Sequence, residues 1–432
     1  MSALPTTKSP FVTKSLRMFF SPTKVADFRG SFLYNIFIRL ENDTIGKIFL
    51  ILALILYFYE GFFTSYFSLN NSPAQLILLF LALIFLKKER LIASKALFWA
   101  IVFLFTVMAS GIFSLILGIK PNMLLLGFLF YFQFFLALVI GMLFLSRENL
   151  ARSIAFLSLP LAFVGLWQFV SNVATPREWL SPTEDIITRA YGFFGSPNVY
   201  GIFFVIMIIC TLTIFLKYKK GLYLLLTIFY IFPVLISFSR TAWVSLAVSA
   251  LFFFLSYKRK YLFVLPIMVL VVLPFRQFRE RIGTVFTQNY LVDSVLDGRI
   301  WSLINGWHLF KNHWFLGTGP GTYGGQIALA NASPIYLQGI QNGYTALYFT
   351  DNQWLQILVQ LGIIGFTIFI FFVIAALVSM LKSFNKKRDI MFLGAATVLV
   401  AFIIAGAFAN VVEFSVLAVP VGLIVGASIN EN

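Results

Sequence analysis

The sequence predicts an all-α, polytopic integral membrane protein with about twelve transmembrane helices. Hydrophobic residues make up 60% of the 432-residue chain and charged residues only 11%, whereas a soluble domain carries about 25% charged residues. Apolar runs near the roughly 20 residues that cross a bilayer recur along the chain. Lys and Arg also gather in alternate loops, as the positive-inside rule describes for membrane proteins.

Uncharged apolar runs predict the spanning helices in chain order. We expect spans at about 48–66, 72–86, 96–118, 121–145, 153–173, 198–216, 221–238, 241–257, 261–275, 352–380, 390–410 and 412–429. The second, ninth and twelfth of these runs are short or interrupted. Because no apolar signal segment lies near the start, we expect the first span to serve as its own insertion signal.

The basic residues of the loops predict the orientation. If the N-terminus is cytoplasmic, the inner segments hold 23 of the 32 Lys and Arg residues, and they account for the net charge of +16. We therefore expect both termini in the cytoplasm and no nucleic-acid partner. The predicted parts are a basic cytoplasmic segment (1–47) that contacts anionic lipid head groups, spans one to nine (48–275), one large extracytoplasmic loop (276–351) and the last three spans (352–429).

The sequence offers little for redox or metal chemistry. Its one cysteine, Cys210, falls within a predicted span, so no intramolecular disulfide can form. The two histidines, His308 and His313, fall in the large outer loop, and no cluster has metal-ligand spacing. We predict no metal and no cofactor.

Arg240 is the first candidate site residue. It lies in the sequence Ser239-Arg240-Thr241-Ala242-Trp243, at the outer start of the eighth span. An arginine that reaches to lipid phosphate is the ordinary interpretation. A cation on the outer side opposes the topology bias, which favours a functional role.

Arg299 begins a segment that predicts an amphipathic helix of about four turns. Apolar residues recur at steps of three and four, namely Ile300, Leu303, Ile304, Trp307, Phe310 and Trp314. Asp297 is the expected N-cap. The helix should lie on the outer membrane surface or pack against the bundle. Arg299 would lie in its first turn, beside backbone N–H groups that favour an anion, and the alternative is a solvated arginine.

Two further outer motifs remain open. Gly317-Thr318-Gly319-Pro320-Gly321 lacks the Gly-Lys-Ser/Thr of a P-loop, so a tight turn is favoured over a phosphate cradle. Arg189 is an outer cation that either contacts an anion or is an ordinary loop residue. After it, Ser196 and Pro197 predict the start of the sixth span.

Asp351 opens the tenth span. A carboxylate there could be a helix N-cap, which the sequence slightly favours, or a general base. Burial would raise its pKa and a nearby arginine would lower it, and the sequence leaves open which effect prevails. Glu413, between the last two spans, is a weaker second acid.

Three outer arginines and one carboxylate suit a diphosphate substrate, because guanidinium groups bind phosphate oxygens in a bidentate way. In a membrane, such a substrate would be a polyprenyl-linked sugar. Glycosyl transfer from it needs a base for the acceptor hydroxyl and cations for the departing diphosphate.

At these motifs the chain resembles the O-antigen ligase and polymerase superfamily of polytopic membrane glycosyltransferases. The resemblance covers about 190–365, with a compatible span pattern on either side. The matching pieces are Gly195-Ser196-Pro197-Asn198-Val199-Tyr200-Gly201, Ser239-Arg240-Thr241-Ala242-Trp243, Gly298-Arg299 with Trp301, His313 with Gly317-Thr318-Gly319-Pro320-Gly321, and Asp351-Asn352-Gln353-Trp354 with Leu361-Gly362-Ile363-Ile364-Gly365.

The resemblance implies metal-independent glycosyl transfer from an undecaprenyl-diphosphate-linked glycan, outside the cytoplasm. Arg240 and Arg299 match the diphosphate-binding arginines, and Asp351 falls where ligases usually carry a catalytic histidine. These three are the expected catalytic residues. The expected contacts to the diphosphate or glycan are Arg189, Asn198, Trp301, His313, Gly319 and Asn352.

The resulting hypothesis is a polymerase of lipid-linked repeat units in the bacterial cytoplasmic membrane. A ligase that moves the glycan to lipid A core or another acceptor is the alternative enzyme, and a lipid-linked oligosaccharide flippase or other transporter is the alternative class. Transporters carry ionisable residues near the bilayer midplane, whereas the predicted span interiors here hold almost none. The expected partners are the lipid-linked donor and acceptor, membrane lipids, a chain-length regulator and a flippase.

Overall fold

The computed structural model describes residues 42–67, 72–85, 94–143, 146–175, 188–264, 299–338 and 349–429, together with the helix Arg276–Gly283 and a few single residues beside it. Every regular element within these residues is a helix, which confirms the all-α prediction for the described chain. The helices are α4 (Asn42–Phe58), α5 (Glu60–Phe67), α6 (Ser72–Phe85), α7 (Lys95–Ile116), α8 (Pro121–Leu143), α9 (Arg147–Leu157), α10 (Leu159–Val170), α11 (Pro197–Tyr218), α12 (Gly221–Ile236), α13 (Arg240–Tyr257), the 3-10 helix η2 (Arg259–Phe263), α15 (Arg276–Gly283), α17 (Arg299–Asn312), α18 (Gln326–Ala330), α19 (Ile335–Gln338), α20 (Gln353–Lys387), α21 (Ile390–Gly406) and α22 (Ser415–Ile429).

The helices agree with a multi-pass membrane protein. Six described helical segments are long and apolar enough to cross a membrane, and five more apolar helices are shorter. Together they match every predicted span except the ninth, 261–275, most of which lies outside the described residues. The fifth span consists of two helices, α9 and α10, which meet at Ser158. The total of twelve spans stays a prediction.

The position of α15 bears on the ninth span. Helix α13 starts at Arg240, close to Phe238, and runs to Tyr257 at the far end of the bundle. Arg281 of α15 donates a hydrogen bond to the carbonyl oxygen of Phe238, at 3.3 Å. Helix α15 therefore lies at the end of the bundle from which α13 starts, which is the end that the predicted ninth span would reach.

Glycines bring α8 and α22 into close backbone contact. A Cβ added to Gly426 would lie 2.0 Å from the carbonyl oxygen of Leu138, and one added to Gly422 would lie 2.6 Å from that of Phe134. Neither approach leaves room for a side chain. Small residues at a helix interface allow such packing inside a membrane, where no hydrophobic force draws helices together.

Helix α20 breaks at Gly362. This residue has φ +64°, and an added Cβ would lie 2.3 Å from the carbonyl oxygen of Phe315. At the break, Thr318 and Gly319 donate backbone hydrogen bonds to the carbonyls of Val359 and Gln360, at 3.0 and 2.8 Å. The segment 317–321 is thus the tight turn that the sequence favoured, and it satisfies the carbonyls that the break would leave unpaired.

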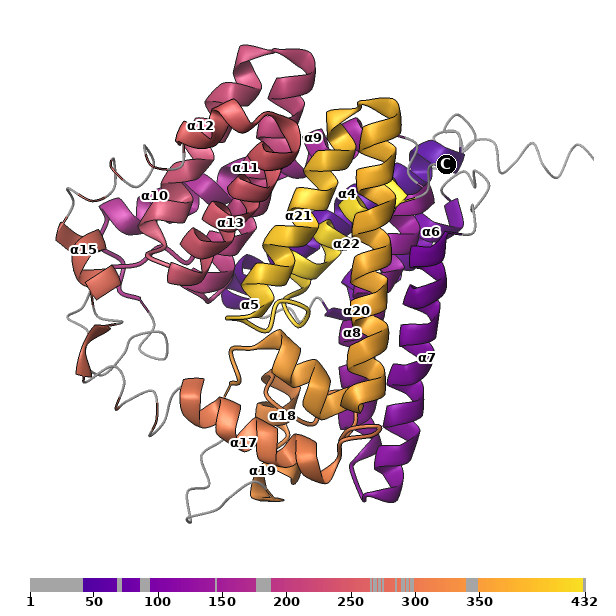
Figure 1. The fold of residues 1–432 in the computed structure, drawn as a ribbon. Helices are drawn as coiled ribbons and strands as arrows, with labels where there is room; N and C mark the ends of the chain where they lie inside the picture. The colour runs from indigo at the N-terminus through magenta and orange to yellow at the C-terminus, as the bar shows by residue number, and fades with distance from the viewer. Residues whose placement is uncertain are drawn as a thin grey trace, which may run out of the picture.

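Figure 1 shows where these elements lie. The α11–α12 and α20–α21 turns lie at the top of the view, which is the predicted inner end, and α17 to α19 lie at the bottom beside the lower ends of α7, α8 and α20. Helix α11 is the most enclosed of the long helices. It begins as predicted, because the Ser196 side chain accepts a hydrogen bond from the Val199 N–H, and Pro197 occupies the first turn.

Candidate active site

Arg299 and Asp351 form an ion pair at the predicted outer end. A terminal nitrogen of Arg299, the first residue of α17, lies 3.6 Å from a carboxylate oxygen of Asp351. The same guanidinium donates to the carbonyl oxygen of Phe408, at 3.4 Å. Burial raises the pKa of the Asp351 carboxyl above its ordinary value, although Arg299 opposes this shift. The competition that the sequence left open is therefore won by burial, which makes Asp351 a stronger base.

Asp351 is not the helix cap. The Asn352 side chain accepts a hydrogen bond from the Leu355 N–H, at 3.0 Å, and so caps α20. Asp351 precedes the cap with a left-handed backbone (φ +47°). The slightly favoured expectation of a capping role for Asp351 is therefore wrong. The predicted substrate contact Asn352 has a structural role at the start of the same helix.

Asn410 holds the segment around Asp351 in place. Its side-chain oxygen accepts hydrogen bonds from the Asn352 N–H at 3.0 Å and from the Thr350 hydroxyl at 3.1 Å. Its amide nitrogen donates to the carbonyl oxygen of Gly324. One buried amide in the α21–α22 turn thus fixes the residues on both sides of Asp351. Sequence reasoning missed it, because an uncharged asparagine in a turn gives no distinguishing signal.

Arg189, Arg240 and Arg281 gather at the α12–α13 turn. The Arg189 guanidinium donates to the carbonyl oxygen of Ser237 at 3.0 Å, next to the Phe238 carbonyl that accepts from Arg281. Burial, and then the positive charge of Arg240, lower the pKa of Arg189 to about 10. Arg189 therefore remains cationic at neutral pH. Because like charges held together repel, an anion bound nearby would be favourable.

Two predicted contacts, Arg189 and Asn198, belong to this arginine group, together with the predicted catalytic residue Arg240. Asn198, at the start of α11, accepts a hydrogen bond from Arg189 at 3.2 Å. Arg240 is the first residue of α13, where the Ser239 side chain caps the helix by accepting from the Ala242 N–H at 3.2 Å. Arg281 was not predicted, because its place depends on how α15 packs against the α12–α13 turn.

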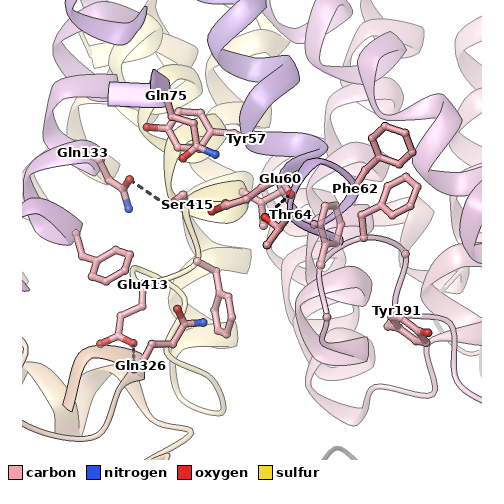
Figure 2. A pocket seen from close by; sticks show the side chains of 18 of the residues that line it. Tyr57, Glu60, Phe62, Thr64, Gln75, Gln133, Tyr191, Gln326, Glu413 and Ser415 are labelled. Carbon is pink, nitrogen blue, oxygen red and sulfur yellow. Dashed lines mark hydrogen bonds between the residues drawn. The ribbon is translucent and has the colours of Figure 1, made fainter. Parts of the chain in front are cut away.

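Glu413 is a second carboxylate of the outer end. It is buried in the α21–α22 turn, where it accepts hydrogen bonds from the Gln326 N–H at 2.8 Å and from the Gln356 side chain. No ion pair joins it to a Lys or Arg of the described chain. Burial raises the pKa of its carboxyl to about 7, against the effect of these hydrogen bonds. Figure 2 shows Glu413 beside Gln326 at the wall of a cavity.

Helix α17 exposes its apolar side. Leu303, Ile304 and Trp307 are 43–50% exposed, whereas Ser302, Gly306 and Leu309 are buried. The predicted apolar face is therefore exposed at these three residues, whereas Phe310 of the same face packs against a buried cluster that contains Leu309 and Leu355. The expected N-cap, Asp297, lies outside the described residues.

The other predicted contacts lie apart from the Arg299–Asp351 pair. Gly319 is buried at the break in α20, where an added Cβ would meet the side chains of Ser114 and Leu124. His313 accepts a backbone hydrogen bond from Gly317 at 3.0 Å, in the same turn. Trp301 is half-buried in the first turn of α17. The structure thus assembles Arg299 with Asp351, and Arg189 with Asn198 and Arg240, while Gly319 and His313 belong to the turn that closes the α20 break.

The chain was compared with known families and proteins. The O-antigen ligase family model matches residues 222–370, about one third of the chain, and this stretch contains Arg240, Arg299 and Asp351. The match confirms the predicted resemblance to the O-antigen ligase and polymerase superfamily, and it indicates membrane glycosyl transfer of the ligase or polymerase type. Among curated proteins, the search found no match.

Proposed function

We propose that this protein polymerises undecaprenyl-diphosphate-linked oligosaccharide repeat units on the outer face of the bacterial cytoplasmic membrane. The observation that carries the proposal is the Arg299–Asp351 pair, in which a carboxylate of raised pKa lies 3.6 Å from a cation. The pair combines the two groups that glycosyl transfer from a diphosphate requires. The family match covers both residues.

Asp351 is the proposed general base. The hydroxyl oxygen of the acceptor sugar attacks the anomeric carbon of the donor, and the bond from that carbon to the diphosphate oxygen breaks. The hydroxyl proton passes to the Asp351 carboxylate, and undecaprenyl diphosphate leaves as the anion. A base of this kind typically contributes about 10²–10⁴-fold to the rate.

The arginines are the proposed diphosphate contacts. Arg299 keeps guanidinium N–H groups beyond those that face Asp351 and Phe408. Arg240 adds a second cation at the start of α13, and Arg189 a third, held by Asn198. Stabilising the charge of the departing diphosphate is the contribution expected of such groups.

The exposed apolar side of α17 supports a lipid-linked donor. Its exposed residues, Leu303, Ile304 and Trp307, follow Arg299 on the same helix. A polyprenyl chain in the bilayer could pass along this face while its diphosphate reaches Arg299. Trp307 suits the membrane interface, where aromatic side chains are enriched.

A ligase is the second candidate, because the matching family model is described as O-antigen ligase. The aspartate in place of the ligases' usual histidine favours the polymerase. To separate them, purified protein in nanodiscs is given one lipid-linked repeat unit, alone or with lipid A core. A ladder of lipid-linked products without core supports the polymerase, and a single transfer to core supports the ligase. Relocation of intact units without any new glycosidic bond would instead indicate a transporter and end the enzyme proposal.

A further inference from the structure

A large cavity lies beside the α21–α22 turn, whose Phe408 carbonyl also accepts a hydrogen bond from Arg299. Its volume is about 1140 Å³, and its walls come from α4 to α6, α8, α10, the 191–195 turn and residues 413–416. Pockets that bind drug-sized ligands measure about 300–1,000 Å³. The cavity is therefore large enough for an oligosaccharide of several sugars.

The walls combine aromatic rings with uncharged amides and two carboxylates. The rings include Phe62, Trp167 and Phe414, and the carboxylates are Glu60 and Glu413. Of the residues that the structure describes along the walls, none is Lys or Arg. A diphosphate would meet two acidic groups without a compensating cation, so this cavity does not suit the charged part of the donor.

Such walls suit an uncharged sugar. A sugar ring has apolar C–H faces, which pack on aromatic rings, and hydroxyl edges, which exchange hydrogen bonds with amides and carboxylates. An alkyl chain would leave the buried amide nitrogen of Gln133 without a hydrogen-bond partner, which costs about 1–3 kcal/mol. This amide therefore favours a glycan over a lipid tail.

Gln133 provides an independent sign of a ligand. Its side-chain oxygen accepts a hydrogen bond from the Ser415 hydroxyl at 3.0 Å. Its amide nitrogen is buried and has no hydrogen-bond partner in the described structure, in a residue only 7% exposed. Figure 2 shows this amide at the cavity wall formed by α8 and Ser415. By contrast, both ends of the Gln168 amide bond to Gly192, at 2.8 and 2.9 Å, and hold the 191–195 turn.

The α21–α22 turn contributes residues to both sites. On one flank, the Phe408 carbonyl accepts from Arg299, and Asn410 fixes Asn352. On the other flank, Glu413 lines the cavity. A ligand in the cavity and a diphosphate at the arginines would therefore both contact this short segment.

We propose that this cavity binds the uncharged sugars of the acceptor glycan, with the Gln133 amide donating to a sugar hydroxyl and Glu413 accepting from another. This inference rests on the proposed function, because it assigns the second substrate of the same reaction. The acceptor site and the diphosphate site then consist of different residues, and only the diphosphate site contains arginines.

Two probes test the assignment without turnover. The first is the repeat-unit oligosaccharide, released from its lipid by mild acid and therefore free of diphosphate. The second is undecaprenyl diphosphate without sugar. Equilibrium binding of each is measured with full-length protein in nanodiscs. The cavity variants are Gln133→Leu and Trp167→Ala, the arginine variant is Arg240→Ala, and Gln277→Leu is an exposed matched control.

Each cavity variant should weaken oligosaccharide binding at least about tenfold and leave undecaprenyl diphosphate binding unchanged. Arg240→Ala should show the reverse pattern, and Gln277→Leu should change neither. Trp167 is 61% exposed, so its variant keeps the test valid if Gln133→Leu fails to fold.

The inference would be overturned if the wild type did not bind the oligosaccharide, or if both cavity variants bound it as the wild type does. Weaker undecaprenyl diphosphate binding by the cavity variants would assign the cavity to the lipid instead. Unchanged binding of undecaprenyl diphosphate by Arg240→Ala would count against the proposed function, and it would leave the result for the cavity variants valid.

Discussion

The two ends of the helix bundle arrange charge differently. At the predicted inner end, Lys217 of α11 donates hydrogen bonds to Glu148 of α9 and to Asp389 before α21, the latter at 3.0 Å. At the predicted outer end, Arg189 and Arg240 lie close enough for the charge of one to lower the pKa of the other.

The difference indicates two roles for charged residues. The inner ion pairs stabilise the fold, and the outer charges suit the binding of a ligand. The inner groups are of opposite sign and link three helices, so each offsets the burial of its neighbour. The outer arginines bring like charges together, and the outer carboxylate Glu413 is buried beside amides. Arrangements that cost stability in this way are typical of functional sites.

The largest expected effect is in thiol labelling of intact cells, which tests which end of the bundle faces the outside of the cell. In a Cys210→Ser background, Gln288→Cys at the outer end should react fully with an impermeant thiol reagent on intact cells. Lys386→Cys at the inner end should react only after the cells are opened. Both residues are exposed. Labelling of position 386 alone on intact cells would reverse the comparison.

Asp351→Asn should lower chain extension by about 10²–10⁴-fold, because an amide cannot accept the proton. Thermal stability should hardly change, since Asn352 caps α20. Asp389→Asn at the inner end is the matched control, and it should lose stability but keep activity. An active Asp351→Asn protein would remove this residue as the base.

Arg240→Ala and Arg299→Ala should each lower polymer formation by about 10²–10³-fold, the usual effect of removing one group that stabilises developing charge. Lysine should restore little at either site, since it lacks the planar fork. Arg276→Ala, on the exposed face of α15, is the control and should be fully active. Normal product ladders from both alanine variants would exclude a diphosphate role.

The pH dependence of stability should reveal the raised pKa of the Glu413 carboxyl. Its carboxyl has a pKa of about 7 in the folded protein and about 4.3 when unfolded. The folded state binds the proton more tightly, so stability should fall as pH rises from about 4.5 to 7, by at most about 2–3 kcal/mol. Glu413→Gln should have a flatter melting-temperature profile between pH 5 and 8. Parallel profiles for the two proteins would contradict the burial of a titrating carboxyl.

Lys217→Met should cost the least, about 1–2 kcal/mol of unfolding free energy, because the pairs that it breaks are partly exposed. Activity per folded molecule should be normal. Lys220→Met, on an exposed neighbouring position, should leave the melting temperature unchanged. Lost catalysis in the stable Lys217 variant would mean that the two ends are coupled.

The sequence predicted the helices well, because they depend on local composition. A charge in an apolar chain is conspicuous, so Arg240, Arg299 and Asp351 could be selected without knowing the fold. The predicted cap of α20 was wrong by one residue. Asp and Asn cap helices about equally well, and only the structure shows the hydrogen bond that identifies Asn352 as the cap.

The rest of the site depends on contacts between distant segments. Gln326 and Glu413 are 87 residues apart, and Asn410 and Gly324 are 86 apart. No periodic pattern connects such segments, so the role of the α21–α22 turn could not be predicted. The sequence also did not predict what the apolar face of α17 contacts. The spacing of apolar residues identifies such a face, but it does not identify the partner that covers it.

The break at Gly362 divides α20 into two parts whose lengths are fixed by different contacts. A helix rotates by about 100° for each residue, so one residue inserted between Gln353 and Gln360 would turn part of the buried glutamine stripe away from its partners, Glu413 and Tyr323. One residue inserted after the break would rotate only the inner part, which is tied to the outer part through a left-handed glycine. The inner part would lose the packing of its own buried residues, Phe369 and Phe372, so the length of α20 is fixed separately on each side of the break.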